Sequence, residues 1–268
     1  QNLSKVNNDV NFVNGDVRDY KLIERLTKDS DGVFHEAALV SVPQSFEMQD
    51  EYFDVNVNGT ENILKLAKEY GFKVIYASSS SVYGNPKQIP IKESDNRNPI
   101  NPYAQTKLKA ELLAEKYSQN NVHVIGLRYF NVFGRRQSKE YAGVIKLFLE
   151  RIQQNKAPKI NGDGLQTRDF VYVEDVVKAN ILAMDSNVKH QFFNVGVGYS
   201  ISILDLANMV IDAHGLSLKP IHISQLPGDI QASQADLELI KKLLNWKAKI
   251  KLDDWLIEVI STKNFTDI

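Results

Sequence analysis

Tyr103 and Lys107 lie four residues apart, in a segment that begins with Asn101 and Pro102. Asn101 suits a helix N-cap and Pro102 suits the first helical position, so the segment predicts a helix that begins here. Residues four apart on a helix share a face, so the phenol and the ammonium would point the same way. Because a nearby ammonium favours the phenolate, we expect Lys107 to lower the pKa of Tyr103 and prepare it to take a proton from a hydroxyl group.

A run of four serines, Ser78 to Ser81, follows the apolar residues 72–77 and precedes Tyr103 by about twenty positions. A short apolar run of this kind predicts a buried strand. In an open α/β sheet, ligands bind at the carboxyl ends of the strands. We therefore expect the serines and Tyr103 to share one site, although a Tyr-x-x-x-Lys pair alone also fits a buried ring beside a solvated lysine.

Strand and helix patterns alternate along the first half of the chain. Strands are expected at residues 10–13, 32–35, 72–77 and 122–128, and helices at 20–27, 50–70 and 102–119. This order predicts an α/β fold with a Rossmann-like, doubly wound parallel sheet. After Gly134 the alternation becomes irregular. There the patterns predict helices at residues 144–153, 174–184, 203–214, 236–244 and 253–261, with short strands at 191–195 and 221–223.

The composition excludes several classes of protein. The chain has 32 Lys and Arg against 33 Asp and Glu, a net charge of -1, so no overall field attracts nucleic acid or anionic lipid. No apolar run approaches the roughly 18 residues of a membrane-spanning helix. The absence of cysteine excludes disulfides and thiolate chemistry and fits a reducing compartment, so we expect a cytoplasmic protein. The histidines show no metal-binding spacing, so no metal site is expected.

The motifs together resemble the extended short-chain dehydrogenase/reductase family, in particular its NAD-dependent nucleotide-sugar epimerases and dehydratases. Beyond the serine run and the Tyr-Lys pair, the matching segments are Gly15-Asp16, His35-Glu36-Ala37-Ala38, Asn56-Val57-Asn58-Gly59-Thr60, Gly162-Asp163-Gly164 and Arg168-Asp169-Phe170. The resemblance implies an NAD-binding Rossmann-like domain at residues 1–135. It also implies that residues 136–268 form mainly a smaller mixed α/β substrate-binding lobe, with segments that return to the first domain.

The glycine-rich phosphate loop of that family has no counterpart in this sequence. Family members begin with a strand, this loop and a helix before the Gly-Asp segment, but these 268 residues contain no Gly-x-Gly-x-x-Gly or Gly-x-x-Gly-x-x-Gly. We therefore expect the first βαβ unit, roughly forty residues, to be absent from the chain as given. Since that unit would hold the cofactor diphosphate, we expect this exact chain to bind NAD poorly.

The resemblance also assigns residues to the cofactor. It implies that Asp16 bonds the adenine amino group of NAD and that Lys107 holds a ribose. The full set implied for NAD is Asp16, Val17, Ala37, Ala38, Asn56, Tyr103, Lys107 and Tyr129. The residues themselves leave other interpretations open: Asp16 fits a turn, the two alanines fit close packing of a helix on a strand, and Asn56 fits a structural position in a helix.

The residues after Ser79 separate the reactions of the family. The resemblance implies that Tyr103 takes the O4 proton of a sugar while Ser79 orients the same oxygen. Its 4,6-dehydratases carry Asp-Glu at the positions of Ser80 and Ser81, and its decarboxylases carry Glu at the second. Two hydroxyl groups there favour 4-epimerisation of a UDP-hexose through a 4-keto intermediate. A dehydratase or decarboxylase, and an inactive truncated member of the family, are the alternatives.

The substrate contacts implied by the resemblance lie mostly in the second half of the chain. Asn131 and Arg168 would bind the diphosphate, the latter as a bidentate donor. Val144 would line the uracil pocket. Ser233 would border the sugar 2-position, where a bulky Tyr excludes an N-acetyl group and Ser leaves room for one. Leu226 and Gln231 stand where family members usually carry Arg, so cations expected near the diphosphate are missing.

The family also pairs its subunits through two helices. In this chain they are the helices expected at residues 50–70 and 102–119. The resemblance therefore implies a homodimer held by a four-helix bundle, with Leu108, Leu112 and Leu113 as an apolar stripe.

Overall fold

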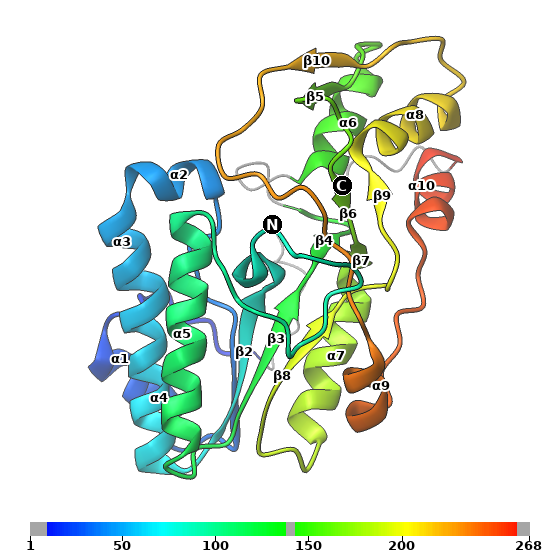
Figure 1. Cartoon of the computed structure of the whole chain (residues 1–268). Coiled ribbons are helices and arrows are strands. Elements are labelled where there is room, and N and C mark those ends of the chain that lie inside the picture. Colours follow the sequence, from blue (N-terminus) through cyan, green and yellow to red (C-terminus); the bar gives the residue numbers. More distant parts are fainter. Residues whose placement is uncertain (1–9, 138–142, 262–268) are drawn as a thin grey trace.

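A parallel sheet forms the centre of the molecule, which the computed structural model describes over residues 10–137 and 143–261. The sheet has four strands in the order β1-β2-β3-β8. Their bounds are Gly32–His35 (β1), Lys73–Ser79 (β2), Val124–Tyr129 (β3) and His190–Val195 (β8). Ser79 pairs with Tyr129, and Tyr129 pairs with Val195, so three strands end level with one another. The carboxyl ends of β2, β3 and β8 therefore meet at one edge, where Figure 1 shows the chain crossing toward the upper lobe.

Helices cover both faces of this sheet (Figure 1). One face carries α4 (Gly59–Tyr70) and α5 (Pro102–Ser118), which pack on Val74 and Tyr76 of β2. The other face carries α7 (Val173–Asp185) and α9 (Glu238–Leu244), which pack on the intervening residue Ile75. Because side chains alternate along a strand and both faces are covered, β2 is apolar on both sides. The predicted doubly wound α/β fold with a parallel sheet is thus confirmed.

A smaller lobe packs above the carboxyl ends of the strands. Its helices are α6 (Val144–Gln153), α8 (Ile203–Ala213) and α10 (Leu252–Ser261). Its short strands are β4 (Asn131–Phe133), β5 (Lys159–Asn161), β6 (Thr167–Arg168), β7 (Phe170–Tyr172), β9 (Ile201–Ser202) and β10 (Ile221–Ile223). The rings of Phe133, Tyr172 and Trp255 meet at the centre of its core, with centroids 5.2 to 6.4 Å apart. Within the described ranges, no helix is long and apolar enough to cross a membrane.

The helix predicted at residues 50–70 is interrupted. It consists of α3 (Gln49–Phe53), a π-helical turn at Asp54–Asn58 and α4, and a separate helix α2 (Val42–Glu47) precedes it. A π-turn widens the helix by one residue and places side chains that a regular α-helix could not. Here it turns the side chain of Asn56 inward, where it is almost fully buried. The apolar pattern of the sequence does not record this interruption.

The strand predicted at residues 10–13 is wrong. These residues adopt no regular structure and precede helix α1 (Tyr20–Thr27). Val10 and Phe12 are 56% and 63% exposed. A strand needs a neighbour to bond with, and β1, an edge of the described sheet, pairs only with β2. The other predicted elements are present, with ends that differ by at most about three residues.

Candidate functional site

Ser79 and Tyr103 meet at the carboxyl edge of the sheet. Ser79 ends β2 and caps the 3-10 turn Ser80–Tyr83, where its Oγ accepts a hydrogen bond of 3.2 Å from the N–H of Ser81. Tyr103 lies in the first turn of α5, which begins as predicted because Asn101 Oδ1 accepts the N–H of Ala104 at 2.9 Å. The Ser79 side chain lies close enough to the phenol of Tyr103 to lower the pKa of that phenol. The structure therefore places the two predicted groups near one another.

The pKa of Tyr103 is raised, not lowered as the sequence predicted. Burial of the phenol raises this pKa, and the nearby Ser79 side chain offsets only part of the effect. The expected lowering by Lys107 is not seen, and the Lys107 Nζ donates to the carbonyl of Ala77 at 2.8 Å. Sharing a helix face did not bring the two polar ends together, since the long lysine side chain reaches the sheet instead.

Lys107 is a buried cation with spare hydrogen-bonding capacity. It is 3% exposed, and burial lowers its pKa to about 8 against the raising effect of Glu36 and Glu111. Its ammonium lies 5.1 Å from the centre of the Tyr76 ring. Among the described residues it makes a single hydrogen bond, although an ammonium carries three donors. The unused donors fit the ribose hydroxyls of a dinucleotide.

Tyr129 lies at the end of β3 in a small polar cluster. Its hydroxyl donates to Glu36 Oε1 at 3.1 Å and accepts from Asn180 Nδ2 at 2.7 Å. Desolvation raises the pKa of Glu36, and Lys107 lowers it in turn. The sequence interpretation missed Asn180. The sequence feature that could have indicated it is a polar residue on the apolar, buried face of α7, among Val176, Ala179 and Ala183.

Asp16 and Val17 lie in the loop before α1, apart from the serines. The Asp16 carboxylate is bound by Arg18, with Arg18 Nη2 2.6 Å from Oδ2, and this partner lowers the pKa of Asp16. Val17 packs on Gly59, where an added Cβ would come within 2.5 Å of Val17 Cγ1. An adenine amino group that bonded the Asp16 carboxylate would therefore share it with Arg18. The contact between Val17 and Gly59 packs the loop against its helix and needs no cofactor.

Asn56 has a full set of partners within the protein. Its Oδ1 accepts the N–H of Leu39 at 2.8 Å, and its Nδ2 donates to the carbonyl of Leu39 at 2.9 Å and to Thr106 Oγ1 at 3.0 Å. Asn56 thus fastens the loop after β1 to α5. That loop carries Ala37 and Ala38, which are exposed and partly buried, respectively. Asn56 therefore braces this loop through its own hydrogen bonds, and a role of Asn56 in cofactor binding stays a prediction.

A cavity of about 230 Å³ brings the predicted substrate residues together. Ser79, Ser80, Ser81, Tyr129, Asn131, Arg168 and Ser233 line it, together with residues 226–230. The Ser81 hydroxyl is buried without a hydrogen-bond partner among the described residues. A buried polar group left unpaired costs about 1–3 kcal/mol, so a polar ligand or water is expected to meet it.

Residues 226–230 close one side of this cavity. The Arg168 guanidinium forms an ion pair with Asp229, and burial lowers the pKa of Arg168. Asn101 Nδ2 donates to the carbonyl of Gly228 at 3.3 Å. Leu226 is 43% exposed, and the N–H of Gln231 donates to Asn85. Two positions at which family members usually carry Arg thus provide no cation, and Arg168 is the cation that lines this cavity.

Val144 lies apart from the cavity lining. It begins α6 and packs against the apolar core of the smaller lobe. Its neighbour residues 138–142 lie outside the described residues. A nucleobase contact by Val144 therefore remains a prediction.

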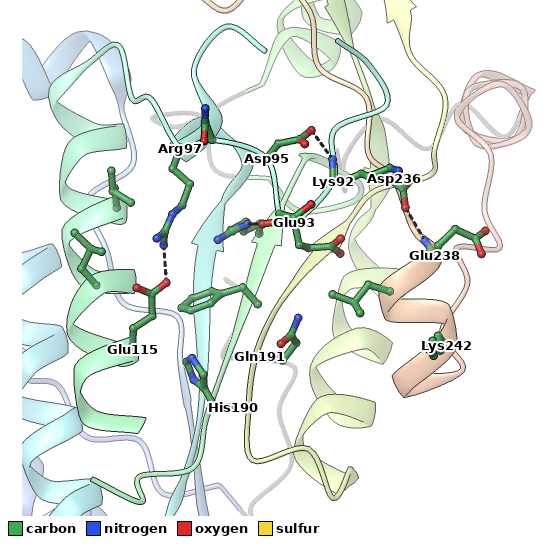
Figure 2. A pocket seen from close by; sticks show the side chains of 17 residues that line it. Lys92, Glu93, Asp95, Arg97, Glu115, His190, Gln191, Asp236, Glu238 and Lys242 are labelled. Carbon is green, nitrogen blue, oxygen red and sulfur yellow. Dashed lines mark hydrogen bonds and ion pairs between the residues drawn. The ribbon is translucent and has the colours of Figure 1, made fainter. Parts of the chain in front are cut away.

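A larger cavity, of about 1110 Å³, lies elsewhere in the described part of the chain. It runs along the β8 edge between α5, α9 and residues 92–97 (Figure 2). Two of its acidic groups are bonded within the protein: Arg97 bonds Glu115 at 2.8 Å, and the Asp95 carboxylate accepts the backbone N–H of Lys92 at 2.9 Å. None of the residues predicted to bind cofactor or substrate or to act in catalysis lines it, although Leu108 and Leu112 of the predicted apolar stripe do. We therefore place the candidate site at the smaller cavity.

Comparisons with known proteins show similarity over nearly the whole chain. The family described as "NAD dependent epimerase/dehydratase family" matches residues 1–196. A putative UDP-glucose 4-epimerase of Methanocaldococcus jannaschii is 36% identical over 97% of this chain and 86% of its own length.

Two solved structures are similar over nearly the whole chain. A UDP-N-acetylglucosamine 4-epimerase from Methanobrevibacter ruminantium, in complex with UDP-N-acetylmuramic acid, aligns with a TM-score of 0.89 and 35% identity over 97% of this chain and 84% of its own. A UDP-glucose 4-epimerase with UDP-glucose from Thermotoga maritima aligns with a TM-score of 0.92 and 30% identity over 98% and 87%.

Proposed function

Because the chain belongs to the NAD dependent epimerase/dehydratase family, we propose that the protein is an NAD-dependent 4-epimerase of UDP-hexoses. The observation that carries this proposal is the proximity of the Ser79 side chain to the Tyr103 phenol, beside a cavity that Ser79, Ser80 and Ser81 line and that has no carboxylate at Ser80 or Ser81. Similar proteins named UDP-glucose 4-epimerases support it.

Tyr103 acts as the base in this proposal. The sugar O4 takes the place beside Tyr103 and Ser79, so that Ser79 orients the oxygen while the phenolate accepts its proton. NAD, when bound, supplies the reversible hydride acceptor for C4 and a positive nicotinamide ring, which lowers the pKa that burial raises in the protein alone. The proton that Tyr103 accepts returns to O4 when the 4-keto sugar is reduced from its opposite face.

Lys107 and Tyr129 hold the cofactor side of the site. The spare donors of the Lys107 ammonium bond the ribose hydroxyls, and its charge favours the phenolate once the side chain turns toward Tyr103. Tyr129 is kept at the end of β3 by Glu36 and Asn180. Ala37 and Ala38 leave room for the dinucleotide on the loop that Asn56 fastens.

Arg168 binds the diphosphate in this proposal. In the protein alone it is paired with Asp229, so a diphosphate must compete with or displace that carboxylate. Arg168 is a planar donor that suits two phosphate oxygens at once. Asn131, which also lines the cavity, adds a second polar contact. When Arg168 exchanges its partner Asp229 for a phosphate, substrate binding would alter the contacts of residues 226–230.

The absence of acid and base at Ser80 and Ser81 separates epimerisation from its alternatives. Elimination of water across C5 and C6 needs a general acid and a general base, whereas hydroxyl groups at these positions offer neither near neutral pH. The full-length protein should therefore convert UDP-glucose to UDP-galactose without accumulating NADH. Formation of a 4-keto-6-deoxy sugar, or no turnover with NAD supplied, would contradict the proposal.

We propose further that N-acetylated UDP-sugars are accepted. Ser233 lines the cavity and is 4% exposed, so a larger side chain there would occupy the cavity itself. Steric exclusion of a bulky group is easier to achieve than selection of a small one.

Ser233→Tyr tests this gate, with UDP-glucose as the internal control. The variant should lower kcat/KM for UDP-N-acetylglucosamine about tenfold or more beyond its effect on UDP-glucose. Equal losses on the two substrates would mean that Ser233 does not border the sugar 2-position.

A further inference from the structure

Asp169 is a buried carboxylate at the junction of three segments. It lies between β6 and β7, is 0% exposed, and its oxygens receive three backbone N–H groups. Val197 donates to Oδ1 at 2.7 Å, and Gly198 and Ala235 donate to Oδ2 at 3.0 Å each. The carboxylate thereby joins β7 to the turn after β8 and to the segment that contains Ser233. No part of the proposed reaction uses this group directly.

Three segments that Asp169 contacts carry a residue of the candidate substrate cavity, and the turn with Val197 and Gly198 carries none. Arg168 is its sequence neighbour, and Ser233 lies two residues before Ala235. The carbonyl of Asp169 accepts the N–H of Asn131 at 2.9 Å. One residue thus makes contact, through its main chain or its carboxylate, with every segment that carries a predicted contact to the diphosphate or the sugar 2-position.

The space around the carboxylate is tightly filled. A Cβ added at Gly196 would lie 2.8 Å from Asp169 Oδ2 and 2.8 Å from Ala235 Cβ, closer than real contacts of this kind. A displacement of the carboxylate would therefore be passed directly to Ala235. Gln234 adds a second tie, because its Nε2 donates to the carbonyl of Gly198 at 3.0 Å.

We infer that Asp169 is a positioning residue, which holds Arg168, Asn131 and Ser233 in register around the substrate. The inference rests on the proposed function for the identity of that substrate. Hydrogen bonds to a charged acceptor are roughly twice as strong as neutral ones, so loss of the charge loosens all three segments together. The effect should fall on substrate affinity and not on the proton transfer at Tyr103.

Protonation of Asp169 gives the inference a signature in pH. Burial raises the pKa of this carboxyl to about 6, against the lowering effect of the three N–H groups. Below about pH 6 the group is therefore neutral and its bonds weaken, so KM for a UDP-sugar should rise as pH falls through this value. The other titratable groups on the segments around Asp169 are Arg168, Asp229, Tyr199 and Asp236. Arg168 pairs with Asp229. In the described residues, only backbone N–H groups bond the Asp169 carboxylate.

Asp175 provides a matched control. It is also buried, at 7% exposed, and its Oδ2 accepts two backbone N–H groups, from Lys249 at 2.9 Å and Ile250 at 3.0 Å. It lies on α7, and it does not line the candidate cavity. Asp175→Asn should therefore lower the melting temperature without changing KM, which isolates a purely structural loss.

The experiment compares wild type, Asp169→Asn, Gly196→Ala and Asp175→Asn in the full-length protein. Asp169→Asn should raise both KM and the calorimetric Kd for UDP-glucose about tenfold or more, with kcat within about threefold of wild type. Its KM should not change between pH 5 and 8. Gly196→Ala, which crowds the same carboxylate but keeps its charge, should raise KM and retain the pH dependence.

Hydrogen exchange separates this inference from the proposed function. In Asp169→Asn, amides of residues 226–236 should exchange faster than in wild type and in Asp175→Asn, with or without substrate. If wild type neither binds nor converts UDP-sugars, the proposed function is wrong. The hydrogen exchange of residues 226–236 then still tests whether Asp169 positions these segments. Unchanged exchange, unchanged KM in Asp169→Asn, or a wild-type KM that is constant from pH 5 to 8 would each overturn the inference.

Discussion

Tyr103 is the residue on which the proposed chemistry depends most. Its phenol lies near Ser79, and burial raises its pKa in the protein alone. Tyr103→Phe keeps the ring and removes the only proposed base. We expect kcat for 4-epimerisation to fall by about 10²-fold or more, because a positioned base contributes roughly 10²–10⁴. The change in KM should be small, and a variant with near wild-type turnover would show that another group takes the O4 proton.

Lys107 gives a prediction that does not depend on turnover. Burial lowers its pKa to about 8, and the negative charges of Glu36 and Glu111 oppose this effect. Above about pH 8 the side chain is neutral, and below it the ammonium is present. Glu36→Gln removes one supporting charge, so the pKa of Lys107 should fall further.

Nuclear magnetic resonance of ¹³C-labelled lysine in the full-length protein would follow this titration, with Lys107→Arg to assign the signal. Lys65, partly exposed and paired with Glu61, serves as a control lysine that Glu36→Gln should not move. A Lys107 signal that titrates near the ordinary lysine value of about 10.4 would contradict the prediction.

At the scale of elements, helix α5 is tied to the sheet by a buried ion pair. Glu111 is 0% exposed and accepts from Arg128 Nε and Nη2 at 2.9 Å each, and from Ser78 Oγ at 2.5 Å. Ser78 precedes Ser79, and Glu111 follows Lys107 by one helical turn. The pair therefore holds the helix with Tyr103 and Lys107 against the strand with Ser79.

Glu111→Gln should destabilise the fold by about 3–5 kcal/mol, because it leaves the charge of buried Arg128 without its main partner. Glu115→Gln is the matched control, since Glu115 is partly exposed and bonds Arg97 at 2.8 Å. That substitution should lower the free energy of unfolding by less than about 1 kcal/mol. Urea unfolding measures both free energies, and equal losses would mean that the buried pair contributes no more than a surface one.

At the scale of the whole molecule, the predicted homodimer depends on the outer surface of α3, α4 and α5. The three leucines predicted as one stripe point in different directions. Leu113 packs into the core between α4, α5 and the sheet, Leu108 packs against the cluster around Val82, and Leu112 is 48% exposed. An apolar contact on α5 would therefore centre on Leu112, with charged residues around it.

Leu112→Asp should shift a dimer toward monomer in sedimentation of the full-length protein at micromolar concentration. Leu147→Asp is the control, because Leu147 is equally exposed at 49% but lies on α6, outside the predicted interface. If wild type is a monomer, or if both variants behave alike, the helices α4 and α5 do not form the interface.

The sequence by itself determined the α/β order, the helix start at Asn101 and the group of residues that should meet at the ends of the strands. These features depend on local signals: alternating apolar runs, a cap followed by proline, and motifs within a few residues of each other. Tyr103 and Ser79 could be paired in advance because each lies at the end of a recognisable element, and parallel strands bring such ends to one edge.

Only the tertiary structure decided where the polar ends of the side chains go. The Lys107 ammonium donates to the carbonyl of Ala77. The side-chain amide of Asn56 is hydrogen-bonded to Leu39 and Thr106. The Asp16 carboxylate forms an ion pair with Arg18. Two other features depend on residues far apart in the chain. They are the buried position of Asn56 in the π-turn and the hydrogen bonds of three segments at Asp169. Long side chains and buried carboxylates choose partners by position in space, and spacing along the sequence does not record those distances.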